Sequence, residues 1–115
     1  MDTTEREDVV SLTYDLLLYI IPQLAKYPRT QKFLLADRIQ TYLMEIMETL
    51  VEAYYSPRQD KSDLLRKANL QLEKLRYLVR LSRDLECINI HRFGVISGKV
   101  DTIGRSIGGW LKSLG

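Results

Sequence analysis

Apolar residues recur along the chain with the three- and four-residue spacing of one helix face, in four successive segments separated by short breaks. The segments predict helices over about 9–26, 30–55, 61–87 and 90–114. None shows the strict alternation that is typical of strands. Helices joined by short loops pack against their neighbours, so the pattern predicts an all-α fold, an antiparallel up-down four-helix bundle.

Helix-breaking and helix-capping residues stand at the breaks. Pro22 is expected to kink or restart the first helix, because proline removes a backbone donor. Thr30 is the predicted N-cap of the second helix, and Asn89 that of the fourth. Residues 56–57 are expected to end the second helix.

The apolar positions also predict which residues form the core. They are Leu35, Ile39, Tyr42, Leu43, Ile46, Leu50 and Ala53 in the second helix; Leu64, Ala68, Leu72, Leu75, Leu78, Val79 and Leu85 in the third; Phe93, Ile96, Val100, Ile103, Ile107, Trp110, Leu111 and Leu114 in the fourth.

More apolar surface is present than one core requires. Leu70, Tyr77 and Leu81 form a second strip on the third helix, and residues 16–21 of the first helix are apolar nearly all round. We therefore expect a homo-oligomer that uses this strip as an interface. The alternative is that these are ordinary surface hydrophobes covered by long neighbouring side chains.

Glycines in the fourth helix stand four residues apart, Gly94 with Gly98 and Gly104 with Gly108. Each costs about 1 kcal/mol relative to alanine in a helix interior. The spacing predicts close approach of another helix, whereas a frayed end is the alternative.

Composition and length favour a single cytoplasmic domain. The chain has 115 residues and one cysteine, Cys87, so an intrachain disulfide is impossible. The apolar run at 16–21 is far shorter than the ~20 residues that span a bilayer, and the acidic start is unlike a signal peptide. No membrane association is expected.

Catalytic and metal-binding patterns are missing from the sequence. His91 is the one histidine, and no Glu-x-x-His, Cys-x-x-Cys, phosphate-binding loop or nucleophile elbow is present. The pair Glu45 and Glu48 fits a solvated helix face better than acid-base catalysis. We expect neither an enzyme nor a cofactor.

Charge is distributed unevenly along the chain. Residues 1–57 hold 5 Lys/Arg against 9 Asp/Glu, and residues 58–115 hold 12 against 6. In the second half Arg76, Arg80 and Arg83 form a row on one helix face, because they stand at i, i+4 and i+7. Guanidinium groups so placed can neutralise phosphates without reading bases.

Arg66 is predicted to continue this row, and Arg105 and Lys112 on the last helix to extend the positive surface. Lys74, a further candidate for nucleic-acid or partner binding, lies off the row on the flank of the second apolar strip. The alternative is that the charges only solvate the protein, helped by local pairs such as Arg80 with Asp84.

Two segments carry a family resemblance: residues 68–81, with the run Leu-Arg-Tyr-Leu-Val-Arg-Leu, and residues 103–112, which read Ile-Gly-Arg-Ser-Ile-Gly-Gly-Trp-Leu-Lys. They resemble the accessory variability determinant (Avd) proteins of diversity-generating retroelements. These belong to a wider four-helix-bundle family that includes proteins encoded in ribosomal intervening sequences.

The resemblance implies a homopentameric barrel that binds the retroelement's reverse transcriptase and its template RNA or cDNA, and so supports mutagenic retrohoming. It gives Arg76 and Arg80, followed by Arg105 and Lys112, the best claim to these contacts. The acidic residues Glu5, Glu7 and Asp8 depart from a uniformly basic surface. An alternative is a protein-protein interaction module that binds no nucleic acid.

Overall fold

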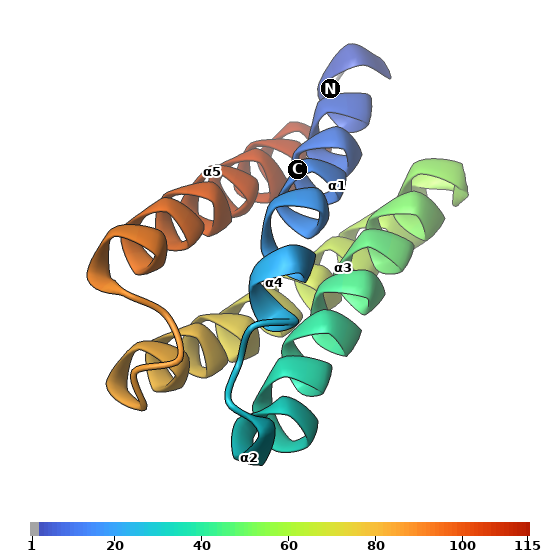
Figure 1. The fold of residues 1–115 in the computed structure, drawn as a ribbon. Coiled ribbons are helices and arrows are strands. Elements are labelled where there is room, and N and C mark those ends of the chain that lie inside the picture. Colours follow the sequence, from blue (N-terminus) through green and yellow to red (C-terminus); the bar gives the residue numbers. More distant parts are fainter. Residues whose placement is uncertain (1–2) are drawn as a thin grey trace.

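The computed structural model describes residues 3–115, with side chains from Val9 onward, so the side chains of Glu5, Glu7 and Asp8 lie outside it. Four long helices and a short helical connection form the described chain, with no strand among these residues (Figure 1). They are α1 (Thr3–Leu24), α2 (Arg29–Gln31), the π-helical turn η1 (Lys32–Ala36), α3 (Asp37–Tyr55), α4 (Arg58–Asp84) and α5 (Ile90–Leu114). The prediction of an all-helical bundle is confirmed.

The four long helices contact one another in a ring. Extensive contacts join α1 to α3, α3 to α4, α4 to α5 and α5 back to α1, and consecutive helices run in opposite directions (Figure 1). The pairs α1 with α4 and α3 with α5 are therefore diagonal. This arrangement gives each helix an inward face for the core and an outward face for solvent or partners.

The inward faces form one continuous apolar core. Its largest fully buried side chains are Trp110, Leu16, Ile20, Ile39, Leu43, Ile46, Leu50, Leu65, Leu72, Leu75, Ile96 and Ile103. On α4 the predicted stripe needs two corrections. Leu65 is buried and the predicted Leu64 only half-buried, while Leu85 is exposed because it follows the last residue of the helix.

The first helix is longer at its start than the sequence predicts and is not restarted at Pro22. It begins at Thr3, six residues before the expected start, and continues through Pro22 to Leu24. Pro22 stands two residues before the helix end. The missing proline N–H therefore costs only one hydrogen bond near the terminus.

The second predicted helix begins earlier, and Thr30 is not its N-cap. Pro28 has φ −53° and ψ 145°, helical structure starts at Arg29, and no side chain caps the terminus. The Gln31 N–H donates to the Pro28 carbonyl at 2.8 Å, which closes the first turn. Pro28 holds the backbone extended directly before the helix, so the helix begins after it and Thr30 lies inside the first helical turn.

The third predicted helix is shifted towards the N-terminus at both ends. It begins at Arg58, directly after Pro57, and ends at Asp84, three residues before the expected Cys87. The chain leaves α4 through Glu86, whose φ is 60°. The Cys87 N–H donates to the Ser82 carbonyl and the Glu86 N–H to the Arg83 carbonyl, the bonds of a Schellman motif.

The start of α5 agrees with the prediction. The side chain of Asn89 accepts a hydrogen bond from the Arg92 N–H at 2.8 Å, and this satisfies one of the free donors of the first turn. The prediction of Asn89 as an N-cap is confirmed.

Candidate nucleic-acid interface

Arg76 lies at the edge of α4 that faces α5 and is engaged within the chain. Its Nη1 donates to Asp101 Oδ1 on α5, and its Nε donates to Glu73 Oε1 at 3.0 Å. The hydrogen bond to Asp101 raises the pKa of Arg76 above its usual value, so the charge is permanent. Two carboxylates already offset this charge, and a phosphate would have to compete with them.

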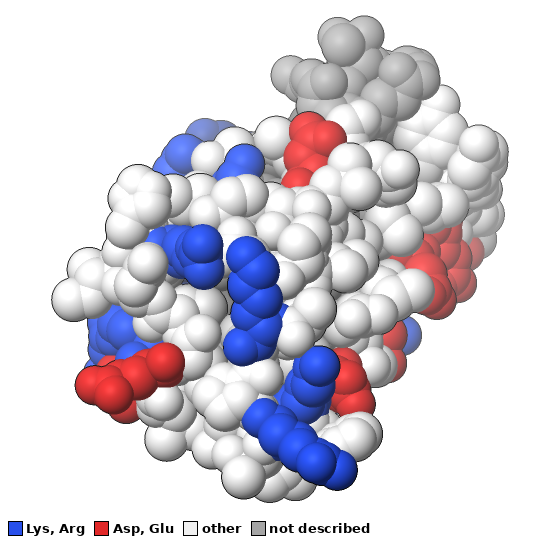
Figure 2. All heavy atoms as spheres, viewed as in Figure 1, with Lys and Arg blue, Asp and Glu red and all other residues white. Residues whose placement is uncertain are grey.

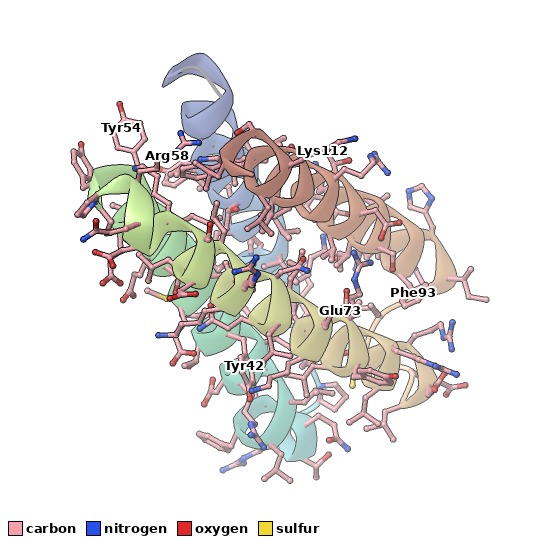
Figure 3. All side chains as sticks on the ribbon, turned by 180° about the vertical axis from the view of Figure 1, so that it is seen from behind. Tyr42, Tyr54, Arg58, Glu73, Phe93 and Lys112 are labelled. Atoms are coloured by element: carbon pink, nitrogen blue, oxygen red, sulfur yellow. The ribbon has the colours of Figure 1, made fainter. Side chains whose placement is uncertain are left out.

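Arg83, at the same edge in the last turn of α4, is also engaged. Its Nη2 lies 2.9 Å from Asp84 Oδ1, and its guanidinium carbon lies 4.5 Å from the ring centroid of Phe93. The second contact is a cation–π interaction between α4 and the first turn of α5, next to the labelled Phe93 in Figure 3. Arg83 therefore helps to hold the two helices together.

Arg80 is the exposed member of the row. The local pair with Asp84 that would neutralise it does not form, and Asp84 pairs with Arg83 instead. Among the described residues Arg80 makes no ion pair. It therefore presents an uncompensated guanidinium to solvent.

The remaining predicted cations lie on the outer surfaces of α4 and α5. Arg66 is 3.9 Å from Asp63, and both side chains are largely exposed, so this pair contributes little. Arg105 donates to Thr102 Oγ1 at 3.3 Å, and Lys74 and Lys112 are exposed. Figure 3 shows Lys112 near the end of α5, where Arg58 donates to the Leu114 carbonyl.

The second apolar strip of α4 faces away from the core, with exposed fractions of 58% for Leu70, 69% for Tyr77 and 44% for Leu81. A similar exposed stripe runs along α1, formed by Tyr14, Leu18 and Ile21. These two stripes lie on diagonal helices. The chain thus has apolar surfaces on two different sides.

The glycines of α5 differ in what surrounds them. A Cβ at Gly104 would stand 3.2 Å from Arg76 Nη2 and 3.4 Å from Leu72 Cδ2, so this glycine permits close packing against α4. A Cβ at Gly94, Gly98 or Gly108 would meet no atom within 4 Å. Among the residues whose side chains are described, the expected close approach is therefore found only at Gly104.

A further group of basic residues, from the end of α1 to the start of α3, was not predicted from the sequence. Lys26, Arg29, Lys32 and Arg38 are all exposed. Figure 2 shows basic side chains over the end of α1 and the α2 segment. The sequence does contain a signal for this group, because positions 26–38 hold four basic residues and one acidic residue. The charge count over the whole N-terminal half hides it, since that half is acidic in total.

The described residues offer no group of three or more His, Cys, Asp or Glu side chains that could hold a metal ion. Burial raises the pKa of the Cys87 thiol, which lowers its thiolate fraction at neutral pH. His91 is exposed at the start of α5. None of the described helices is long and apolar enough to cross a bilayer.

The fold is a helical bundle, and its candidate sites are basic and apolar surface patches. These features define the class of the protein as a helical bundle that contacts other macromolecules. A family model described as bAvd-like matches residues 9–114. The chain therefore belongs to the bAvd-like family, as the resemblance of residues 68–81 and 103–112 indicates. None of the curated proteins and none of the solved structures compared with the chain matches it.

Membership of this family indicates that the chain is an accessory protein of a diversity-generating retroelement. The members of this family are accessory proteins and not catalysts.

Proposed function

We propose that the protein binds the reverse transcriptase of a diversity-generating retroelement together with its template RNA or cDNA, and that it supports mutagenic retrohoming in the cytoplasm. The match of the bAvd-like family over residues 9–114 carries this proposal. The protein itself supplies binding surfaces and no catalytic group.

The charge on α4 and α5 supports nucleic-acid binding. Arg80, Lys74 and Lys112 are exposed and make no ion pair with a described carboxylate, and the hydroxyl of Thr102 leaves the charge of Arg105 intact. Cations of this kind bind phosphates and release condensed counterions, so affinity falls as salt rises. Arg76 and Arg83 belong to the same surface, but their internal contacts assign them mainly to joining α4 and α5.

The apolar stripes support assembly into a ring, with five copies as the proposed number. The α4 strip (Leu70, Tyr77, Leu81) and the α1 stripe (Tyr14, Leu18, Ile21) lie on different sides of the bundle. A contact between two different surfaces is heterologous, and its repetition closes into a ring when the rotation permits. Such a ring would bring several copies of the basic surface together.

Binding of labelled template RNA at several salt concentrations tests the proposed function. Wild-type protein is expected to bind with an affinity that falls steeply with salt, and the triple variant Arg80→Ala, Arg105→Ala, Lys112→Ala to bind more weakly with a shallower salt dependence. Lys67→Ala is the matched control, because Lys67 lines a hollow with Glu45, Glu48 and Glu52. Unchanged affinity in the triple variant would contradict the proposed surface.

A protein-only interaction module is the second candidate, and the exposed α4 strip favours it. It predicts capture of the reverse transcriptase that survives high salt and is lost on Tyr77→Glu, with no RNA binding at any salt concentration.

A further inference from the structure

The segment that connects α1 to α3, together with the first two residues of α3, is a distinct basic surface, separate from the α4 and α5 cations. Within residues 26–38 four side chains are basic and one, Asp37, is acidic. Lys26, Arg29, Lys32 and Arg38 are exposed, and none forms an ion pair with a described carboxylate. Their charge is available to an external anion.

Two large apolar side chains project from the middle of this basic segment. Phe33 is 74% exposed and Leu34 72%, and neither packs against the core, whereas the next residues, Leu35 and Ala36, are buried. Leu35 and Ala36 anchor the turn. The fold therefore gives no reason for an aromatic ring at position 33.

The backbone that carries Phe33 is held in place on both sides. Tyr27, near the start of the segment, is buried and lies beside Ser82 of α4. Residues 32–36 form a π-helical turn, a rare geometry that occurs frequently at functional sites. A ring presented from a fixed backbone loses little entropy when it binds a partner.

We infer that residues 26–38 bind single-stranded nucleic acid, with Phe33 stacking on an unpaired base and the surrounding cations binding the flanking phosphates. Exposed aromatic rings within positively charged surfaces are the usual means of binding single strands, because every base has a face on which a ring can stack. Bases inside a duplex are already stacked and cannot use Phe33 in this way.

This inference rests on the proposed function and makes it more specific. The α4 and α5 cations offer phosphate contacts, which a duplex satisfies as well as a single strand. Phe33 adds a preference for the single-stranded state of a template or its copy. A protein partner or an anionic membrane would have to match four unpaired cations that surround two apolar side chains. A single strand matches both features, because its phosphates bind the cations and its base faces contact the apolar side chains.

The test compares a twelve-nucleotide oligouridine with a duplex RNA of the same length. Phe33→Ala is expected to weaken oligouridine binding about tenfold, within the range of base–aromatic stacking, and to leave duplex binding unchanged. Leu34→Ala is the matched control, because Leu34 is equally exposed but has no ring. Phe33→Tyr should retain the affinity.

A spectroscopic readout separates stacking from a general loss of binding. The native chain has one tryptophan, Trp110, which is fully buried, so Phe33→Trp places a second one at the surface. Oligouridine should quench this added fluorescence, and the duplex should not. Arg29→Ala and Lys32→Ala should each reduce the salt slope of oligouridine binding by about one.

Each other outcome overturns the inference in a distinguishable way. If wild-type protein binds no RNA, the proposed nucleic-acid function fails as well. If it binds RNA but Phe33→Ala and Phe33→Trp behave like Leu34→Ala, only the role of Phe33 fails. Loss of reverse transcriptase capture in both alanine variants with RNA binding intact indicates protein docking, and a response of Phe33→Trp to phosphatidylserine vesicles alone indicates a lipid surface.

Discussion

The guanidinium of Arg76 on α4 bonds the carboxylate of Asp101 on α5 and lies against the backbone of Gly104. The Arg76 side chain is 33% exposed and that of Asp101 50%. This contact joins two helices whose paired residues are 25 positions apart in the sequence. It assigns Arg76 to the packing of α4 on α5 as much as to any external anion.

Arg80→Ala should therefore reduce RNA affinity more than Arg76→Ala does. Arg80 is exposed and makes no ion pair among the described residues, whereas Asp101 and Glu73 compete with phosphate for Arg76. Arg80→Ala is expected to reduce the salt slope by about one. Arg76→Ala is expected to lower the free energy of unfolding by up to about 1 kcal/mol, as for partly exposed ion pairs.

Fluorescence anisotropy across a salt series and urea unfolding measure the two effects separately. Greater loss of RNA affinity in Arg76→Ala, with stability unchanged, would contradict this assignment.

Gly98→Ala should be stabilising and Gly104→Ala should gain less or lose stability. Alanine is favoured over glycine by about 1 kcal/mol in a helix interior, and a Cβ at Gly98 meets no atom within 4 Å. At Gly104 the new methyl group would stand 3.2 Å from Arg76 Nη2, so the guanidinium would have to shift slightly. Urea unfolding of the two variants should show Gly98→Ala as the more stable, and the reverse order would contradict the packing described for Gly104.

Glu86→Gly should stabilise the protein by about 1 kcal/mol. Glu86 has φ 60°, a left-handed conformation that side chains disfavour by about 1–2 kcal/mol and that glycine adopts readily. The side chain is exposed, so its removal costs few contacts. Glu52→Gly, an exposed position inside α3, is the control and should destabilise by about 1 kcal/mol. Equal losses of stability in thermal unfolding would contradict the strain assigned to Glu86.

The helix stripes could be predicted because burial repeats with the helix period. Ile39, Leu43, Ile46 and Leu50 are all buried as the spacing indicates. The helix ends were harder to predict than the stripes. At the end of α4, Glu86 occupies a position that usually holds glycine, so the sequence gives no signal that the helix stops there. The π-helical turn has no periodic signature either.

The candidate site could be predicted only as a set of residues on one helix face. Helix spacing favours a pair between Arg80 and Asp84, but the structure pairs Asp84 with its neighbour Arg83. Which arginine stays available depends on rotamers and on the register of α5, and neither follows from periodicity. The exposure of Phe33 depends on the π-helical turn at 32–36, so it could not be predicted from periodicity either.

Stability should decline at alkaline pH partly through Tyr27. Burial raises the pKa of Tyr27, and this effect exceeds the opposing one of the hydrogen bond to Ser82. The unfolded chain, with a tyrosine pKa of about 10, therefore releases this proton first, and the contribution is present below pH about 10 and lost above it. Tyr27→Phe should flatten the decline in urea unfolding above that pH. Tyr55→Phe, at an exposed position, is the control, and identical pH profiles for both variants would contradict the role of Tyr27.

Charge introduced into the outward strip of α4 should dissociate the assembly without unfolding the bundle. Tyr77 is 69% exposed in the single chain, so Tyr77→Glu places its carboxylate in water there but within an apolar contact if copies assemble. Light scattering after gel filtration should then give the mass of a single chain, while the helical circular dichroism stays unchanged. Leu18→Glu should act in the same way, because a heterologous contact needs both the α1 and the α4 stripe.

Ile90→Glu is the control for both variants, since Ile90 is also a large exposed apolar residue but stands apart from either stripe at the start of α5. A single-chain mass for the wild type would refute assembly itself. Dissociation by Tyr77→Glu but not by Leu18→Glu would replace the ring with a twofold dimer, because a contact between two α4 strips uses the same surface twice and leaves α1 free.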